Sequence, residues 1–250
     1  MISSCTILHY GKEWLAWSLR SVADVVDKMY VVYSPTPSMG STTTLQCPDT
    51  RNELMDIAAD CGAYWNDCPE HYGAEWQHRA YAMGLCEKLG SNLIVILDAD
   101  EVWDPFDLEY AIKFVEAEQM GSKYRVGMRH FWRSTKWVCD DQAQPERFVK
   151  IGDSLRKDSY SYIPSIIKPY HFGYAQSPAL VNYKMEIHGH KSEIRPGWYD
   201  NIFLPWKPGD KDVHPTNKDN WWEPKPYIDT EGKLEFLIGD HPYWNKDIIE

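Results

Sequence analysis

One short stretch constrains the fold of this chain more than any other. Residues 93–97 (LIVIL) form an apolar run with no polar interruption, and Asp98, Asp100 and Glu101 follow at once. Such a run is typical of a strand buried on both faces, in the centre of a parallel sheet. In open α/β sheets, ligands bind just beyond the carboxyl ends of the strands. The sequence therefore predicts three carboxylates at the ligand-binding edge of a sheet.

Strand and helix patterns alternate through the first 120 residues. Apolar or β-branched runs predict strands at 5–10, 29–33, 63–65 and 93–97, and periodic apolar positions predict helices at 15–26, 50–62, 74–90 and after 104. Thr50 with Glu53 forms a capping-box pattern, and Asp104 followed by Pro105 is a typical helix start. This alternation predicts a mostly parallel sheet covered by helices on both faces.

The second half of the chain has a different pattern. Residues 123–132 and 146–152 are expected to form antiparallel strands, with a loop at 139–145 between them. Beyond Ser154 the helix signals become sparse, and Pro, Trp and Tyr become frequent. The expected fold class is therefore α/β: a Rossmann-like, mostly parallel central sheet flanked by helices, with a smaller mixed sheet and an irregular, Trp/Tyr/Pro-rich C-terminal part.

Composition excludes some classes of protein. The 250 residues are 43% hydrophobic and 14% aromatic, which suits a chain with a large core and not a disordered one. The net charge of −11 disfavours a general nucleic-acid binder, although a local basic groove would still admit DNA. No apolar run reaches the roughly 18 residues of a membrane-spanning helix. The start of the sequence lacks a signal-peptide pattern, and none of the six cysteines forms a C-x-x-C pair, so a cytoplasmic location is expected.

The acidic stretch has a chemical use. Carboxylates at Asp98 and Asp100 are hard oxygen ligands that suit Mn²⁺ or Mg²⁺, and their mutual repulsion would be removed by a bound cation. The alternative interpretation is an exposed acidic turn that caps the following helix.

The residues around this stretch resemble a known family. LIVILDADEVW, with the preceding EWQHRAYAMGLCEKLGS, is similar to the D-x-D region of inverting, family-2-type glycosyltransferases with the GT-A fold. KEWLAWSLRSVADVVDKM followed by YVVY is similar to the N-terminal part of the same family. The resemblance implies one GT-A-like domain over 1–250, with a nucleotide-sugar-binding half at 1–120 and an acceptor-binding half at 121–250. It also implies a nucleotide-sugar donor, Mn²⁺ or Mg²⁺, and a carbohydrate or other hydroxyl acceptor.

Two positions depart from the family pattern. Gly11, Lys12 and Glu13 stand where Asn-Glu is usual after the first strand, and Tyr33 with Ser34 replaces the Asp that usually ends the second strand. The base of the donor nucleotide is therefore left open.

The resemblance also implies roles for individual side chains. His171 would complete the metal site of Asp98 and Asp100, and His188 with His190 is the competing pair, because neighbours at i and i+2 in a strand share a face. Asp141, or else Asp140, would be the base that takes the acceptor's proton. The expected donor-binding residues are Asp98, Arg79, Arg147, Glu13 and Lys184; Arg147 and Lys184 could instead form ordinary surface ion pairs.

Aromatic residues of the last third are expected to offer stacking surfaces to an acceptor, or else to anchor irregular loops; these are Trp198, Trp206, Trp221, Trp222 and Trp244. Two other functions stay open. A haloacid-dehalogenase-type phosphatase also places D-x-D after a central strand. A non-catalytic carbohydrate- or nucleotide-binding module would have the same fold without the catalytic activity.

Overall fold

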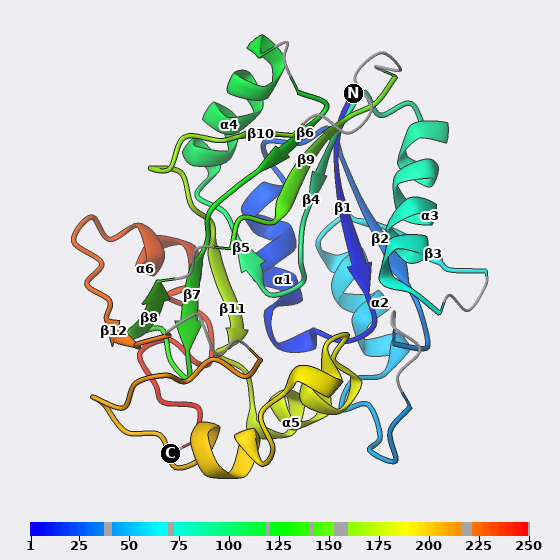
Figure 1. Cartoon of the computed structure of the whole chain (residues 1–250). Coiled ribbons are helices and arrows are strands. Elements are labelled where there is room, and N and C mark those ends of the chain that lie inside the picture. Colours follow the sequence, from blue (N-terminus) through cyan, green and yellow to red (C-terminus); the bar gives the residue numbers. More distant parts are fainter. Residues whose placement is uncertain are drawn as a thin grey trace.

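The computed structural model of the chain contains two sheets and the helices that pack on them (Figure 1). It describes residues 1–37, 42–69, 73–118, 121–140, 143–152, 160–216 and 222–249, and for Asp140 it describes the backbone only. No helix in these ranges is both long enough and apolar enough to cross a membrane.

The larger sheet has the strand order β10-β6-β9-β4-β1-β2-β3. Its strands are β1 (Ile2–Leu8), β2 (Lys28–Tyr33), β3 (Tyr64–Asp67), β4 (Leu93–Ile96), β6 (Lys123–Arg125), β9 (Glu146–Lys150) and β10 (Tyr160–Tyr162). All neighbours run parallel except β9, which is antiparallel to both β4 and β6. The expected mostly parallel sheet is confirmed, and β4 is its central strand.

Four helices flank this sheet: α1 (Lys12–Val22), α2 (Arg51–Asp60), α3 (Glu75–Lys88) and α4 (Pro105–Ala117). The predicted caps are present, since Thr50 and Glu53 form a reciprocal capping box and the Asp104 side chain accepts from the first turn of α4. Helix α3 packs on one face of the sheet, and α1, α2 and α4 pack on the other. Both faces are therefore covered, as the alternation predicted.

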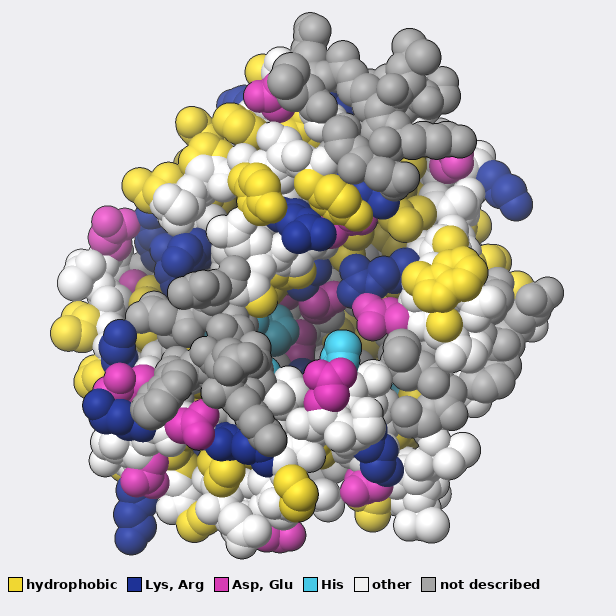
Figure 2. All heavy atoms as spheres, in the orientation of Figure 1, with side chains coloured by type: hydrophobic (Ala, Val, Ile, Leu, Met, Phe, Trp, Pro, Cys, Tyr) yellow, Lys and Arg dark blue, Asp and Glu magenta, His cyan; other side chains and the backbone are white. Residues whose placement is uncertain are grey.

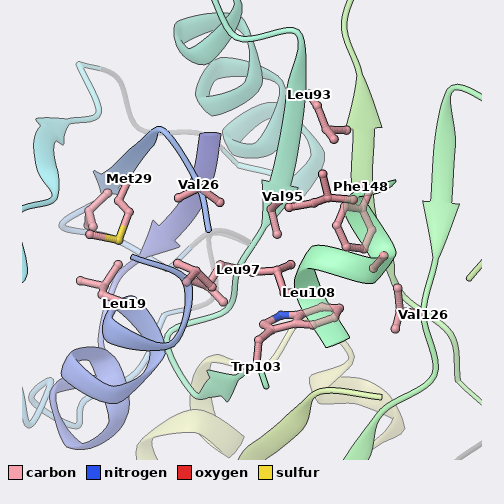
Figure 3. Packing of buried hydrophobic residues seen from close by; sticks show 14 of the residues in the cluster. Leu19, Val26, Met29, Leu93, Val95, Leu97, Trp103, Leu108, Val126 and Phe148 are labelled. Carbon is pink, nitrogen blue, oxygen red and sulfur yellow. The ribbon is translucent and has the colours of Figure 1, made fainter. Parts of the chain in front are cut away.

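The apolar run after Asn92 is explained by these two layers. Leu93, Val95 and Leu97 point toward α1 and α4, as Figure 3 shows, whereas Ile94 and Ile96 point toward α3. All five side chains are at most 5% exposed. A polar residue at any of these positions would lose its hydration without gaining a partner.

The second sheet is smaller and mixed, as expected. Its order is β12-β8-β7-β11-β5, from β5 (Glu101–Val102), β7 (Arg129–Trp132), β8 (Trp137–Asp140), β11 (Tyr170–Tyr174) and β12 (Lys225–Pro226). Strand β11 is parallel to β7 and antiparallel to β5.

Three expectations for the second half were wrong in detail. Residues 123–132 are not one strand: β6 ends at Arg125 in the large sheet, and β7 begins at Arg129 in the small one. The expected loop at 139–145 begins later, because Cys139 and Asp140 belong to β8. The second half also adds β6, β9 and β10 to the large sheet, since the edge of β4 left open by β1 needs backbone partners.

The C-terminal third packs through aromatic side chains. Its regular elements are α5 (Pro178–Ile187), a 3-10 turn (Lys191–Glu193), a π-helical turn (Tyr199–Phe203) and α6 (Lys233–Ile238). Trp198, Trp206 and Trp222 are at most 4% exposed and form a second core with Trp132. These three tryptophans therefore anchor irregular chain and offer no open stacking surface. Trp244 is half-buried, and Trp221 lies outside the described residues.

Candidate active site

A pocket of about 420 Å³ lies where β1 and β4 end, at the carboxyl edge of the large sheet. Figure 2 shows a hollow in this face of the molecule, with histidine, acidic and basic side chains gathered around it. The pocket is lined by residues that follow β1, residues that follow β4, the first turns of α3, strand β11 and the end of α5. The sequence predicted the acidic stretch at this same edge of the sheet.

Asp98, Asp100 and His171 come together in this pocket. Each offers one ligand atom, and the three atoms lie within 4.8 Å of one another. The small sheet brings the histidine close, because β11 pairs with β5 directly after the acidic loop and the backbone N–H of Phe172 donates to the carbonyl of Asp100 (2.7 Å). His171 Nε2 then lies 3.4 Å from Asp100 Oδ1.

This donor set fits a divalent metal cation. Two carboxylates and one imidazole are accepted ligands of that ion. Burial opposes ionisation of Asp100, but the charge of Lys184 and the contact with His171 outweigh it and hold the pKa of Asp100 well below its usual range. Burial also opposes ionisation of Asp98, and the charge of Arg147 nevertheless keeps the pKa of Asp98 lowered. Both carboxylates are therefore negative at neutral pH.

Neighbouring side chains hold one oxygen of each carboxylate. Arg147 donates to Oδ2 of Asp98, and Gln176 Nε2 donates to Oδ2 of Asp100 (2.8 Å). The Lys184 ammonium also lies 3.5 Å from Asp100 Oδ2. These contacts fix the carboxylates while the Oδ1 atoms take no part in them, which is how outer residues orient metal ligands.

Glu101, the third carboxylate of the stretch, is turned away from the pocket. Its side chain is fully buried and accepts from Trp103 Nε1 (2.6 Å) and Arg147 Nε (2.7 Å). Burial raises the pKa of Glu101 to about 7, against the lowering effect of Arg147. Its contacts shape the loop between β4 and α4.

Two of the expected donor-binding cations line the pocket. Lys184 reaches it from α5, and its ammonium also donates to the carbonyl of Gly173 (3.1 Å). Arg79 reaches it from α3 and forms an ion pair with Glu75 one turn earlier (2.6 Å). Both side chains keep some exposure, at 15% and 32%.

Two of the five expected donor-binding residues, Arg147 and Glu13, do not line the pocket. The Arg147 side chain is 3% exposed, is engaged by Asp98 and Glu101, and does not line the pocket. Glu13 does not line the pocket; its carboxylate accepts from the backbone N–H of Ser177 (2.8 Å), the N-cap of α5. Burial raises the pKa of Glu13. Glu13 thus joins the start of α1 to the start of α5.

His188 and His190 line the same pocket but do not form the expected strand pair. Helix α5 ends at Ile187, and His188 is its C-cap. Burial lowers the pKa of His188 to about 4, with further lowering from Lys184. In the described part of the chain, the metal-binding group contains His171 and neither of these two histidines.

Of the two candidates for the catalytic base, the structure describes only the backbone of one. Asp141 lies outside the described residues, and Asp140 is the last residue of β8. The backbone register pairs Asp140 with Arg129, and Cys139 with His130.

Several pocket residues were not anticipated. His9 and Tyr10 follow β1, and the strand-end rule that singled out the acidic stretch could have identified them too. Gly11 comes next, with φ of +137°, and a Cβ there would lie 2.7 Å from the Cβ of Ala99. The loops after β1 and β4 therefore touch, and glycine permits the contact. Gln176 carries no sequence signal of its role.

Comparisons with known proteins give only distant likenesses. No protein-family model matches the sequence, and no curated protein matches it. Among solved structures, the chain is similar to a mycobacterial protein (15% identity, 54% of this chain and 41% of that one, TM-score 0.36). It is also similar to residues 1–349 of S. aureus TarS (9%, 74% and 64%, TM-score 0.44) and to the mannosyltransferase PcManGT from Pyrobaculum calidifontis, solved with GDP-Man and Mn²⁺ (12%, 74% and 60%, TM-score 0.44).

The chain spans less than two thirds of the length of each of these three structures. The chain's own strand order and helices show an α/β fold with a mostly parallel sheet flanked by helices and a second, smaller mixed sheet.

Proposed function

We propose that this chain is a metal-dependent glycosyltransferase that moves a sugar from a nucleotide-sugar donor to a hydroxyl acceptor, with inversion at the transferred carbon. The observation that carries the proposal is the group of Asp98, Asp100 and His171 inside a pocket of about 420 Å³ at the carboxyl edge of the sheet. This is where open α/β sheets bind their ligands, and the pocket has the size of a small-molecule site.

Asp98, Asp100 and His171 are the residues that would hold Mn²⁺ or Mg²⁺. The bound cation would supply positive charge to the diphosphate that leaves the sugar. Lys184 and Arg79 line the same pocket, and we assign them to the diphosphate oxygens, where the guanidinium can bind two oxygens at once.

In this proposal Arg147 and Glu13 position other residues of the site. Arg147 orients Asp98 through its buried contact, and Glu13 holds the start of α5, the helix that carries Lys184. Neither residue touches the donor in this proposal.

We assign the catalytic base to Asp141 in preference to Asp140. The backbone register pairs Asp140 with Arg129, a residue that lines a different pocket. Asp141 follows directly in the same acidic stretch of the sequence. Asp141→Asn should lower turnover at least a hundredfold while leaving donor affinity within about twofold.

The proposal is tested first by ligand-induced stabilisation. UDP-, GDP-, CMP- and dTDP-sugars are added one at a time, with and without Mn²⁺, and the melting temperature is measured. One nucleotide class should stabilise the protein only with metal; a ligand at one hundred times its Kd contributes about 2.7 kcal/mol. Asp100→Asn should remove the metal-dependent part, while the exposed Asp56→Asn serves as the matched control. Equal metal-dependent stabilisation of Asp100→Asn would overturn the metal site.

A second assay separates the proposal from the phosphatase alternative. The stabilising nucleotide-sugar is incubated with saccharide and hydroxymethylated DNA acceptors, and release of the nucleoside diphosphate is measured. Release that depends on one acceptor supports the transferase. Phosphate release from an aryl phosphate, abolished by Asp98→Asn, would replace it with the phosphatase.

A further inference from the structure

The small sheet aligns a row of residues beside the carboxylate pair, and His171 of this row faces Asp100. The strand register aligns Glu101 of β5, His171 of β11, His130 of β7 and Cys139 of β8 as direct neighbours. Directly paired residues of adjacent strands project to the same face. The row therefore places His130 behind His171, on the side away from β5.

The two histidines meet through one particular pair of atoms. Nδ1 of His130 lies 3.0 Å from Nδ1 of His171, a hydrogen-bond distance at which one nitrogen donates and the other accepts. The other ring nitrogen of His171, Nε2, points to Asp100, at 3.4 Å from Oδ1. The contact with His130 therefore occupies Nδ1 and leaves Nε2 as the atom that faces the carboxylates.

We propose that His130 is a positioning residue that keeps the proton of His171 on Nδ1 and thereby presents the Nε2 lone pair to a divalent cation. This inference rests on the proposed metal site, because a cation at Asp98 and Asp100 can bind His171 only through an unprotonated Nε2. If His130 donated instead, the neutral ring of His171 would carry its proton on Nε2 and could not coordinate. In the proposed arrangement, Nδ1–H of His171 therefore donates and Nδ1 of His130 accepts.

The surroundings of His130 hold it in place for this task. The residue is 7% exposed, and the ring of buried Trp222 lies against it with centroids 5.1 Å apart. A buried second ring that accepts from a metal-binding histidine matches the outer contacts that orient metal ligands in general. Arg147 donates to Oδ2 of Asp98, and Gln176 donates to Oδ2 of Asp100. With His130 on Nδ1 of His171, each of the three metal-binding side chains is therefore held by a neighbouring side chain.

Two substitutions separate this role from simple packing. His130→Asn keeps an acceptor, because Oδ1 of asparagine lies close to the position of Nδ1 of histidine. His130→Leu has a similar volume but no acceptor. His78→Leu is the control: it also replaces a buried histidine (1% exposed), and His78 neither lines the pocket nor belongs to the metal-binding group.

The first measurement is the nitrogen-15 spectrum of the histidine rings in the metal-free protein, with His171 assigned by its loss in His171→Gln. We expect Nδ1 of His171 to be protonated in the parent and in His130→Asn, and the proton to be redistributed to Nε2 in His130→Leu. An unprotonated Nδ1 in the parent would overturn the proposal. This spectrum requires neither metal nor nucleotide.

The second measurement is Mn²⁺ affinity by electron paramagnetic resonance titration, on variants whose melting temperature is first recorded. We expect His130→Leu to weaken Mn²⁺ binding about 10- to 100-fold, and His130→Asn to stay within about threefold of the parent. Parent-like Mn²⁺ affinity in His130→Leu would refute the positioning role. A parent that binds no Mn²⁺ would refute the metal site itself, and the spectrum distinguishes this failure because it reports the proton without metal.

Discussion

Arg147 lies at the centre of the buried charges beneath the pocket, and its removal gives the sharpest test of the geometry. Its side chain is 3% exposed, and that of Glu101 is fully buried. Arg147 donates through Nε to Glu101 (2.7 Å), through a second nitrogen to Asp98, and through a third to the backbone carbonyl of Glu146 (3.0 Å). Arg147→Met keeps an unbranched apolar stem but leaves the carboxylate of Glu101 without its cation.

The expected loss of stability is large. Removing one partner of a buried ion pair costs about 3–5 kcal/mol, because the remaining charge is left in a low-dielectric interior. Glu101→Gln removes that charge and keeps an oxygen for Trp103 Nε1, so alone it should cost about 1–3 kcal/mol. In the Glu101→Gln background, Arg147→Met should cost at least about 1.5 kcal/mol less than in the parent, because no buried anion is then stranded.

Urea denaturation at pH 7.5 of the parent, the two single variants and the double variant measures these values. Lys113→Met is the matched control: its ion pair with Glu109 is on the surface, with the lysine side chain 68% exposed, so its removal should cost at most about 0.5 kcal/mol. Two outcomes contradict the reasoning. One is a cost below about 1 kcal/mol for Arg147→Met, and the other is additivity of the two single costs within about 0.5 kcal/mol.

Three further predictions concern other parts of the fold. Burial lowers the pKa of His241 from 6.5 to about 4. Between these pH values the unfolded chain binds a proton that the folded chain does not, so stability falls by up to about 1.4 kcal/mol per unit as the pH drops. His241→Gln should reduce that slope in urea titrations at pH 7 and 5, and an unchanged slope would contradict the assignment. Gly11→Ala should destabilise the protein by about 1–3 kcal/mol, because its φ is +137° and its Cβ would meet that of Ala99 at 2.7 Å. Ala99→Gly should recover part of this loss in melting temperature, and a parent-like melting temperature for Gly11→Ala would refute the close approach. Thr50→Ala should cost about 0.5–2 kcal/mol by calorimetry, whereas Thr50→Ser should stay within a few tenths; equal losses would show that the cap hydrogen bond is not responsible.

Most of the first 120 residues could be predicted because their signals are local. The capping box at Thr50, the start of α4 at Asp104 and the buried strand β4 each depend on side chains within a few positions of one another. The second half could not be predicted as well. Nothing in 123–132 reveals that β6 and β7 belong to different sheets, because strand partners are chosen by the edges that earlier elements leave open.

That Asp98 and Asp100 follow a central strand could be predicted from the sequence, since an apolar run and its polar end are properties of neighbouring residues. The side chains that surround these two carboxylates depend on how distant parts of the chain pack together. Strand register set His130 behind His171, and packing turned Glu101 and Arg147 inward. Such contacts join residues far apart in the chain, and their geometry depends on how whole sheets and helices pack, which no short pattern of residues encodes.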